Sequence, residues 1–372
     1  MAKYKIALMP GDGIGNDVMD AAKIVLDKIG LSADYVHADI GWEFWCQEGE
    51  PLPERTIELL KTCDCGLFAA ITSKPKEEAE AELCPELQGQ GMIYRSPIVR
   101  LRQRFDLYTN LRPCRAFKGN PLNYRDDIDL VVFRENTQGL YAGVEFHPLP
   151  DDLRAKLEDL SPNMAAFEGV SSEDIALSTR IFTRAGCQRI VRQAFEYAKR
   201  HDYKTVTLVE KPNVIRETSG LMVREARKIA AEYADIDLWE TNVDAMAMWL
   251  VKNPQDYGVL VASNMFGDII SDLAAQLVGG LGFAASGNIG DDFAVFEPTH
   301  GSAPKYAGLY KVNPTAMLLA TQLMLDWLGE RDKGLALHQA IAQVIAAGKV
   351  RTYDMGGDAS TLEMAEAIAD HL

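Results

Sequence analysis

Cysteine is scarce in this chain: six residues are spread over a length of 372. Cys63 and Cys65 lie too close together for the usual zinc knuckle, and no histidine follows at ligand spacing. No apolar run approaches the roughly 18 residues of a membrane span, and the short apolar N-terminus enters a glycine-rich turn instead of continuing as a signal sequence. We therefore expect a cytoplasmic protein with reduced thiols and no membrane partner.

Positive charge is also in short supply. Lysine and arginine number 38 against 54 acidic residues, which gives a net charge of −16. A nucleic-acid binder shows a basic footprint, so this balance argues against nucleic acid as a partner. The hydrophobic share of 47% is typical of a globular protein, and the length corresponds to roughly two domains of about 150 residues.

What the sequence does contain is an alternation of β-branched apolar runs with helical patterns, which predicts a mainly parallel sheet covered by helices. The predicted strands are 4–9, 34–40, 66–71, 107–115, 128–135, 205–210, 236–243 and 259–264, with a strand-like segment at 141–147. The predicted helices are 15–29, 54–61, 171–200, 218–233, 268–280, 313–328, 335–347 and 359–371.

The helix predicted over 171–200 has apolar residues on more than one side, which suggests a subunit interface. Ser171 or Ser172 would cap it. No low-complexity linker and no internal repeat is visible. Two domains without a linker suggest that the chain crosses between them more than once.

Three features suggest chemistry. The cluster Gly11-x-Gly13-x-Gly15 follows a strand, but its spacing differs from the dinucleotide fingerprint, so a tight turn is the simpler interpretation. Residues 95–115 hold six arginines and one acid, a local +5 in an acidic chain. Arginine binds carboxylates through two parallel hydrogen bonds, so this segment predicts an anion pocket, with a solvated basic face as the alternative.

The third feature is the pair Asp268 and Asp272, four residues apart at a predicted helix start. Like charges on one helix face repel unless a cation joins them, and carboxylates suit Mg²⁺ or Mn²⁺. The alternative is that a helix N-terminus simply tolerates acids. Tyr141 and Lys211 cannot be assigned a role on their own, although Lys211 ends a strand, where open α/β sheets bind ligands.

Taken together, six ordered motifs resemble the β-decarboxylating dehydrogenases, which act on isocitrate, homoisocitrate, isopropylmalate, and tartrate or malate. The resemblance covers essentially the whole chain. It is carried by Gly11-Asp-Gly-Ile-Gly15, Asp106-Leu-Tyr-Thr-Asn-Leu-Arg-Pro113, Arg134-Glu-Asn-Thr-Gln-Gly-Leu-Tyr141, Asn264-Met-Phe-Gly-Asp-Ile-Ile-Ser-Asp272, Gly287-Asn-Ile-Gly290 and His300-Gly-Ser-Ala-Pro304.

This resemblance implies an α/β fold of the isocitrate/isopropylmalate dehydrogenase type, with two interleaved domains and no conventional Rossmann domain. Residues 1–106 and 258–372 would form a large domain with both termini, and residues 107–257 a small domain. The protein would be a homodimer, or a higher homo-oligomer, whose subunits share their active sites.

The family's roles, carried over by motif, imply that Tyr141 and Lys211 are catalytic. Lys211 of the partner chain would help remove the C2 hydroxyl proton, and Tyr141 would protonate the product of decarboxylation. The remaining roles are substrate binding by Ser96, Arg102, Arg112 and Arg134, and Mg²⁺ or Mn²⁺ binding by Asp268 and Asp272 with Asp244 from the second subunit.

The resemblance also implies a nucleotide site. Its residues would be Thr72, Asn213, Glu297, His300, Gly301, Lys305, Tyr306 and Asn313. NAD-dependent members have an acid and an aliphatic residue where this chain has Lys305-Tyr306, and Tyr353 also fits the NADP pattern. The arginine expected at position 357 is absent, since Gly357 stands there. We expect NAD or NADP, with NADP favoured.

The implied reaction is oxidation and decarboxylation of a hydroxy tri- or dicarboxylate. We expect isocitrate, converted to 2-oxoglutarate as in the tricarboxylic acid cycle. Ser96-Pro-Ile-Val99 resembles homoisocitrate enzymes, which keeps that substrate open. Isopropylmalate is disfavoured because Tyr94-Arg95-Ser96 is polar. A non-catalytic regulatory subunit is a further alternative, against which the intact Tyr141, Lys211 and three aspartates argue.

Overall fold

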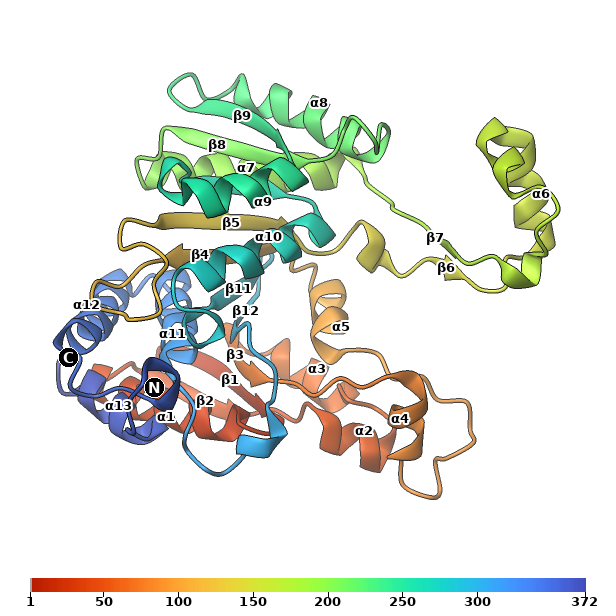
Figure 1. Cartoon of the computed structure of the whole chain (residues 1–372). Helices are drawn as coiled ribbons and strands as arrows, with labels where there is room; N and C mark the ends of the chain where they lie inside the picture. The colour runs from red at the N-terminus through yellow and green to blue at the C-terminus, as the bar shows by residue number, and fades with distance from the viewer. Residues whose placement is uncertain (1) are drawn as a thin grey trace.

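The computed structural model describes residues 2–372, which fold around one ten-stranded sheet covered by helices (Figure 1). Its strand order is β2-β1-β3-β12-β11-β4-β5-β10-β8-β9. The strands are β1 (Tyr4–Gly11), β2 (Ala33–His37), β3 (Cys65–Ala70), β4 (Thr109–Arg115), β5 (Asp129–Glu135), β8 (Thr205–Glu210), β9 (Asp237–Asn242), β10 (Val259–Ala262), β11 (Ala285–Ile289) and β12 (Ala294–Pro298).

The sheet is parallel towards both edges and antiparallel at its centre. β11 runs antiparallel to both β12 and β4, and β4 runs antiparallel to β5. Neither β11 nor β12 is among the predicted strands. β11 reads Ala-Ser-Gly-Asn-Ile, which has little intrinsic β-propensity, so its pairing with two neighbouring strands decides its conformation.

Residues 2–372 form thirteen α-helices, most of which pack around the sheet, whereas α6 lies away from it (Figure 1). They are α1 (Gly15–Ile29), α2 (Trp42–Glu48), α3 (Glu54–Leu60), α4 (Lys76–Ala81), α5 (Pro97–Arg104), α6 (Asp151–Leu160), α7 (Arg184–Arg200), α8 (Thr218–Ala230), α9 (Val243–Lys252), α10 (Asn264–Leu277), α11 (Thr315–Trp327), α12 (Arg331–Ala347) and α13 (Thr361–Ala369).

The long helix predicted over 171–200 is wrong in its first half. Ser171 caps only a short 3₁₀ turn over Ser172–Asp174, and α7 begins at Arg184 with Thr183 as its cap. The residues between them form the strand β7 (Leu177–Ser178), which pairs with β6 (Glu145–Phe146). The acidic and apolar residues between 171 and 183 are compatible with either a helix or a strand. The pairing of β7 with β6 decides in favour of the strand.

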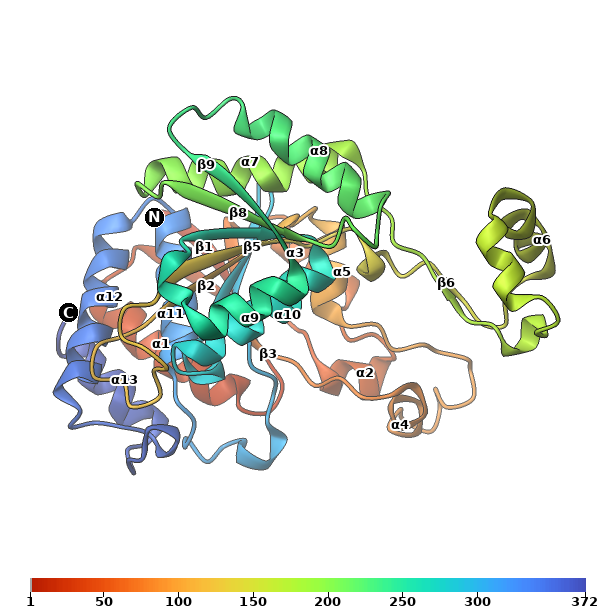
Figure 2. The same ribbon diagram turned by 45° about the horizontal axis from the view of Figure 1, so that its top comes forward.

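This strand pair carries an arm that projects from the body of the molecule, with α6 at its far end (Figure 2). No residue of α6 is buried. The exposed apolar side chains of the arm include Leu160 of α6 and Phe167 after it, which are 77% and 48% exposed. The arm therefore has no hydrophobic core of its own.

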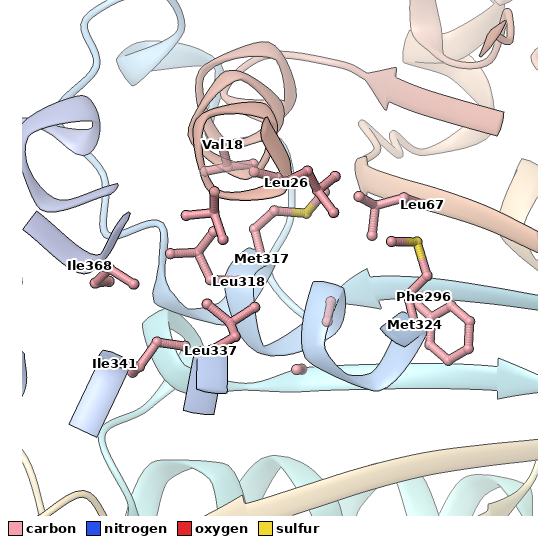
Figure 3. Packing of buried hydrophobic residues seen from close by; sticks show 14 of the residues in the cluster. Val18, Leu26, Leu67, Phe296, Met317, Leu318, Met324, Leu337, Ile341 and Ile368 are labelled. Atoms are coloured by element: carbon pink, nitrogen blue, oxygen red, sulfur yellow. The ribbon is translucent and has the colours of Figure 1, made fainter. Parts of the chain in front are cut away.

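The largest apolar cluster joins the two ends of the chain (Figure 3). Val18 and Leu26 of α1 lie in the same cluster as Met317 of α11 and Ile368 of α13, packed on Leu67 of β3. A second group of clusters surrounds β5, β8 and β10. β10 and α10 pack with these middle strands, although the predicted boundary at residue 258 assigns them to the large domain. The division into 1–106 with 258–372 and 107–257 stays a prediction.

Candidate active site

Three buried arginines from three different elements meet at the antiparallel centre of the sheet. Arg102 lies on α5, Arg112 on β4 and Arg134 at the end of β5, and they are 7%, 8% and 2% exposed. On β4 and β5 alternate side chains face the same side of the sheet, which brings Arg112 and Arg134 onto the face covered by α10.

Asp268 of α10 receives two of these guanidinium groups. Arg134 Nη1 lies 2.5 Å and Arg112 Nη2 3.3 Å from Asp268 Oδ1. Arg112 Nη1 also donates to Asp272 Oδ1 at 2.8 Å. Gly267 permits this approach of helix to strand, because a Cβ there would lie 2.7 Å from the Cβ of Arg134. The helix begins at Asn264, so Asp268 lies in its second turn and not at its start as predicted.

The charges in this cluster shift one another's pKa values. Burial, with the nearby positive charges of Arg102 and Arg112, lowers the pKa of Arg134 to about 9. Burial disfavours the charged form of Asp268, but Arg134 and Arg112 outweigh it and lower the pKa of that carboxyl. Asp268 is therefore ionised at neutral pH. The guanidinium groups of Arg112 and Arg134 therefore lie within hydrogen-bond distance of the carboxylates of Asp268 and Asp272.

Tyr141 reaches the same carboxylate from the short 3₁₀ turn Leu140–Ala142. Its hydroxyl donates to Asp268 Oδ2 at 2.7 Å, and the guanidinium of Arg134 lies 5.0 Å from the centre of its ring. Burial and the negative charge of Asp268 raise the pKa of Tyr141, so the phenol keeps its proton at neutral pH. The predicted residues Arg102, Arg112, Arg134, Tyr141, Asp268 and Asp272 thus lie in one cluster.

Asn288 of β11 connects the arginines to the core of the sheet. It accepts hydrogen bonds from Arg102 Nε at 2.9 Å and from Asn110 Nδ2 at 2.9 Å, and it donates to Glu297 Oε1 at 2.7 Å. Glu297 also faces Arg102 Nη2 at 3.2 Å. Glu297, predicted to bind the cofactor, is therefore the counter-ion of a buried arginine in this chain.

Lys211 and Asp244 stand apart from the cluster. Lys211 Nζ lies 2.5 Å from Asp244 Oδ1, and among residues 2–372 neither side chain bonds to Asp268, Asp272 or Tyr141. The part of the chain that the structure describes contains no group of three His, Cys, Asp or Glu side chains placed to hold a metal. Within one copy of the chain, Asp244 therefore does not join Asp268 and Asp272 in such a group.

Most of the predicted nucleotide residues lie in or beside the loop after β12, whereas Asn213 follows β8. Thr72 Oγ1 lies 2.7 Å from Ser302 Oγ, and Lys305 Nζ lies over the ring of Tyr306 at 4.8 Å. His300 Nε2 is buried without a hydrogen-bond partner among residues 2–372, and no atom lies closer than 4.0 Å to a Cβ placed on Gly301. An orphaned polar atom beside open space fits a loop that receives a polar ligand.

The predicted binding residues differ in whether their side chains are hydrogen-bonded within the protein. Asn313 accepts from the Thr315 amide and donates to Asp354 Oδ2 at 3.0 Å, which uses its side chain internally. Asn213 is exposed and Ser96 is partly exposed at the start of α5, and the side chains of both lack hydrogen bonds within residues 2–372.

Comparison with known proteins resolves the family. The model of the isocitrate/isopropylmalate dehydrogenase family matches residues 5–368. The chain belongs to this family. Its members are β-decarboxylating dehydrogenases, and their names include more than one substrate.

Individual relatives match over nearly the whole chain. The 3-isopropylmalate dehydrogenase of Methanothermobacter thermautotrophicus is 40% identical over 100% of this chain and 99% of its own. The isocitrate/homoisocitrate dehydrogenase of Thermus thermophilus is 38% identical over 99% and 98%. The protein DlpA of Legionella pneumophila is 39% identical, and the match spans 99% of this chain but 58% of DlpA.

A solved structure of isocitrate dehydrogenase from Methylococcus capsulatus has the same fold as this chain. It superposes with a TM-score of 0.85 at 39% identity and covers 99% of both chains. The α/β fold with a large mixed sheet is thereby confirmed. None of the helices in residues 2–372 is long and apolar enough to span a membrane.

Sequence reasoning missed the amides that orient the family's arginines. Asn264 Oδ1 accepts from Arg134 Nε at 3.0 Å and Nη2 at 2.7 Å, and Asn110 Oδ1 accepts from Arg112 Nε at 2.7 Å. Asn264 and Asn288 stand inside motifs of the resemblance, but a neutral amide has no charge or spacing that marks it in one sequence.

Proposed function

We propose that this protein is a metal-dependent dehydrogenase that oxidises and decarboxylates isocitrate, giving 2-oxoglutarate and CO₂ and passing a hydride to NAD or NADP. The observation that carries the proposal is the pairing of the Arg112 and Arg134 guanidinium groups with the carboxylates of Asp268 and Asp272 beside a protonated Tyr141. A third guanidinium group, that of Arg102, lies next to them. A cation on the carboxylates and a polycarboxylate on the guanidiniums would bind together without leaving net charge in a largely buried site.

The donor set fits a hard divalent cation. Asp268 and Asp272 supply carboxylate oxygens one helical turn apart, and Asp272 is 61% exposed and so accessible. Asp244 of a second copy would complete the site. When bound, Mg²⁺ or Mn²⁺ would polarise the C2 oxygen of the substrate and lower the energy of negative charge that develops there.

The chain's own residues account for binding and proton movement. Arg102, Arg112 and Arg134 hold the substrate carboxylates, and Ser96 precedes α5, the helix that carries Arg102. Lys211 of a second copy accepts the proton of the C2 hydroxyl. After CO₂ leaves from C3, Tyr141 donates its phenolic proton to that carbon. A nicotinamide cofactor, when bound, would supply the acceptor for the C2 hydride, whose removal has to precede the loss of CO₂.

The nucleotide would lie along Thr72, Asn213, Glu297, His300, Gly301, Lys305, Tyr306 and Asn313. Lys305 and Lys311 form no ion pairs within residues 2–372 and lie near the rings of Tyr306 and Tyr353. Those two rings are 5.7 Å apart. A preference for NADP rests on Lys305, because an ammonium group attracts a 2′-phosphate.

In this proposal, the site is completed by a second copy of the chain in a homodimer. Met248 and Val251 on α9 and Ile269 on α10 are 56%, 47% and 56% exposed, which is unusual for large apolar side chains on neighbouring helices. The projecting arm is a second surface without a core. A second copy packed here would cover both surfaces and bring its Lys211 and Asp244 to the cluster.

Homoisocitrate is the competing substrate. Ile98, which stands where NADP-dependent isocitrate enzymes have an asparagine, is 8% exposed and belongs to an apolar cluster, so it offers no polar contact to a distal carboxylate. Isopropylmalate fits less well, because the polar Tyr94 and Arg95 precede Ser96. The regulatory-subunit alternative predicts binding without turnover.

One assay tests the proposal. We would measure kcat/KM for isocitrate, homoisocitrate and 3-isopropylmalate, each with NAD and with NADP, in the presence of Mg²⁺. The highest value is expected for isocitrate, with discrimination of about 10- to 200-fold per methylene. A higher value for homoisocitrate would transfer the assignment to that acid, and no turnover with any pair would favour the regulatory subunit.

A further inference from the structure

The strands β4, β11 and β12 line a cavity on the face of the sheet opposite the arginine cluster. Along β4, Asn110 and Arg112 face α10, whereas Leu111 and Arg115 line a cavity of about 510 Å³. The same alternation separates Asn288 from Ile289 on β11 and Glu297 from Phe296 on β12. The volume lies within the range of about 300–1,000 Å³ that is usual for small-molecule sites.

The walls of the cavity come from distant parts of the chain. The end of α7 contributes Tyr197 and Arg200 on one side, and α11 and α12 contribute Trp327 and Arg331 on the other. The helices α9 and α10, which we assign to the dimer interface, pack on the opposite face of these strands. The cavity is therefore separate from both the arginine cluster and that interface.

Aromatic rings line much of the cavity. Tyr197 is stacked on His201 with their centres 4.1 Å apart, and Phe117 lies 5.1 Å from His338. Trp327 adds a further aromatic surface, and Phe296 closes the floor. Planar ligands stack on such rings, and this favours a flat aromatic molecule over a flexible aliphatic one.

The charged residues at the cavity favour an anion. The cavity is lined by Arg115, Arg200 and Arg331 together with Asp326 and Asp332. Arg115 is bound to Asp129 at 2.7 Å, whereas Arg200 and Arg331 have no ion pair or hydrogen bond from their side chains within residues 2–372. Burial and nearby arginines lower the pKa values of His201 and His338, so neither adds charge at neutral pH.

We propose that this cavity binds a small planar aromatic anion, with the ring among Tyr197, Trp327 and Phe296 and the anionic group on Arg200 and Arg331. Guanidinium groups pair with carboxylates, sulfonates and phosphates, and they also stack on aromatic rings. A ligand with an anionic group on an aromatic ring can make both kinds of contact. The walls of the cavity come from α7 on one side and from α11 and α12 on the other. A bound ligand would therefore hold these helices together, although they are far apart in sequence. This site is independent of the proposed reaction.

The test uses 8-anilinonaphthalene-1-sulfonate, an aromatic sulfonate whose fluorescence increases when it leaves water. Fluorescence titration of the full chain should show a saturable site. Arg200→Glu and Arg331→Glu should each weaken binding about tenfold, the effect of one lost charge-assisted contact. The matched control is Arg224→Glu on α8, since Arg224 is also exposed and outside the cavity. Its titration should equal that of the wild type.

Two further measurements locate the dye. Leu335→Trp adds bulk at the rim, where Leu335 is 56% exposed, and should remove the saturable phase with little risk to folding. Energy transfer from tryptophan to the dye should fall in Trp327→Phe. Equal affinity in the wild type and all cavity variants would overturn the proposal. A crystal structure of the wild-type protein with the dye decides the matter if a variant unfolds: dye bound only elsewhere refutes the site.

Discussion

Asp268 is the residue on which the candidate site depends, because it binds Arg134, Arg112 and Tyr141 at once. Each partner comes from a different part of the chain, so no local pattern could place them together. The motifs predicted which residues matter. Their convergence on one carboxylate, and the buried amides of Asn110, Asn264 and Asn288 beneath them, follow from the packing of α10 on β4 and β5.

Replacing Tyr141 with phenylalanine tests its role as general acid. The variant loses only the phenolic proton and its hydrogen bond to Asp268, so kcat should fall about 100-fold or more while KM changes little. Steady-state kinetics with the best substrate measure both constants. Tyr124→Phe, at a tyrosine that is 56% exposed, is the control and should behave as the wild type. An unchanged kcat in the Tyr141 variant would remove the acid role.

Lys305 is expected to select the nucleotide. Lys305→Asp places a carboxylate where the ammonium group attracts a 2′-phosphate, so the ratio of kcat/KM for NADP to that for NAD should fall about tenfold or more. Lys3→Asp is not a suitable control, because Lys3 is bound to Glu330 at 2.7 Å. Lys349→Asp, a change of the same charge outside the site, should leave the ratio unaltered. If Lys305→Asp also leaves it unaltered, Lys305 does not contact the phosphate.

At the scale of elements, prediction succeeded where periodicity is strong and failed where pairing decides. The parallel strands β1, β3, β8 and β10 and the amphipathic helices α1 and α8 were predicted within a few residues. β7, β11 and β12 were not predicted, and β6 takes up only two residues of the strand-like segment predicted over 141–147, because these short segments become strands only through their neighbours.

The helices α9 and α10 allow a prediction about assembly. Met248→Glu places a charge on the exposed apolar face of α9, so the dimer should dissociate and turnover should fall with it, because Lys211 and Asp244 no longer reach the second cluster. Analytical ultracentrifugation and activity at matched concentration measure the two effects. Tyr124→Glu, at a side chain also 56% exposed, serves as the control. A fully active monomer of the Met248 variant would contradict the shared site.

At the scale of the whole molecule, the candidate site gathers three arginines inside an acidic chain. The chain carries −16 overall, yet three arginines lie buried at the centre of its sheet. Burying charge is unfavourable unless it is paired, and here Asp268, Asp272 and Glu297 supply the pairing. The three arginines of the candidate site are thus held with their counter-ions, which come from neighbouring elements.

Removing divalent metal tests the whole arrangement. Excess EDTA should abolish turnover, and Mg²⁺ or Mn²⁺ should restore it, because without a cation the carboxylates of Asp268 and Asp272 stay paired with Arg134 and Arg112. Far-UV circular dichroism should be unchanged, since the cores contain no metal ligands. Full activity in EDTA would refute the metal assignment.

The fold class, the family and the charged residues of the site could be predicted from the amino-acid order, because ordered motifs and hydrophobic periodicity are local properties of the chain. Which of those residues meet depends on the folded chain. Arg112, Arg134, Tyr141 and Asp268 are brought together by strand order and helix packing, whereas Lys211 and Asp244 remain apart from them within one chain. Contacts between distant segments depend on the register and order of the whole sheet, and no single segment of the sequence encodes them.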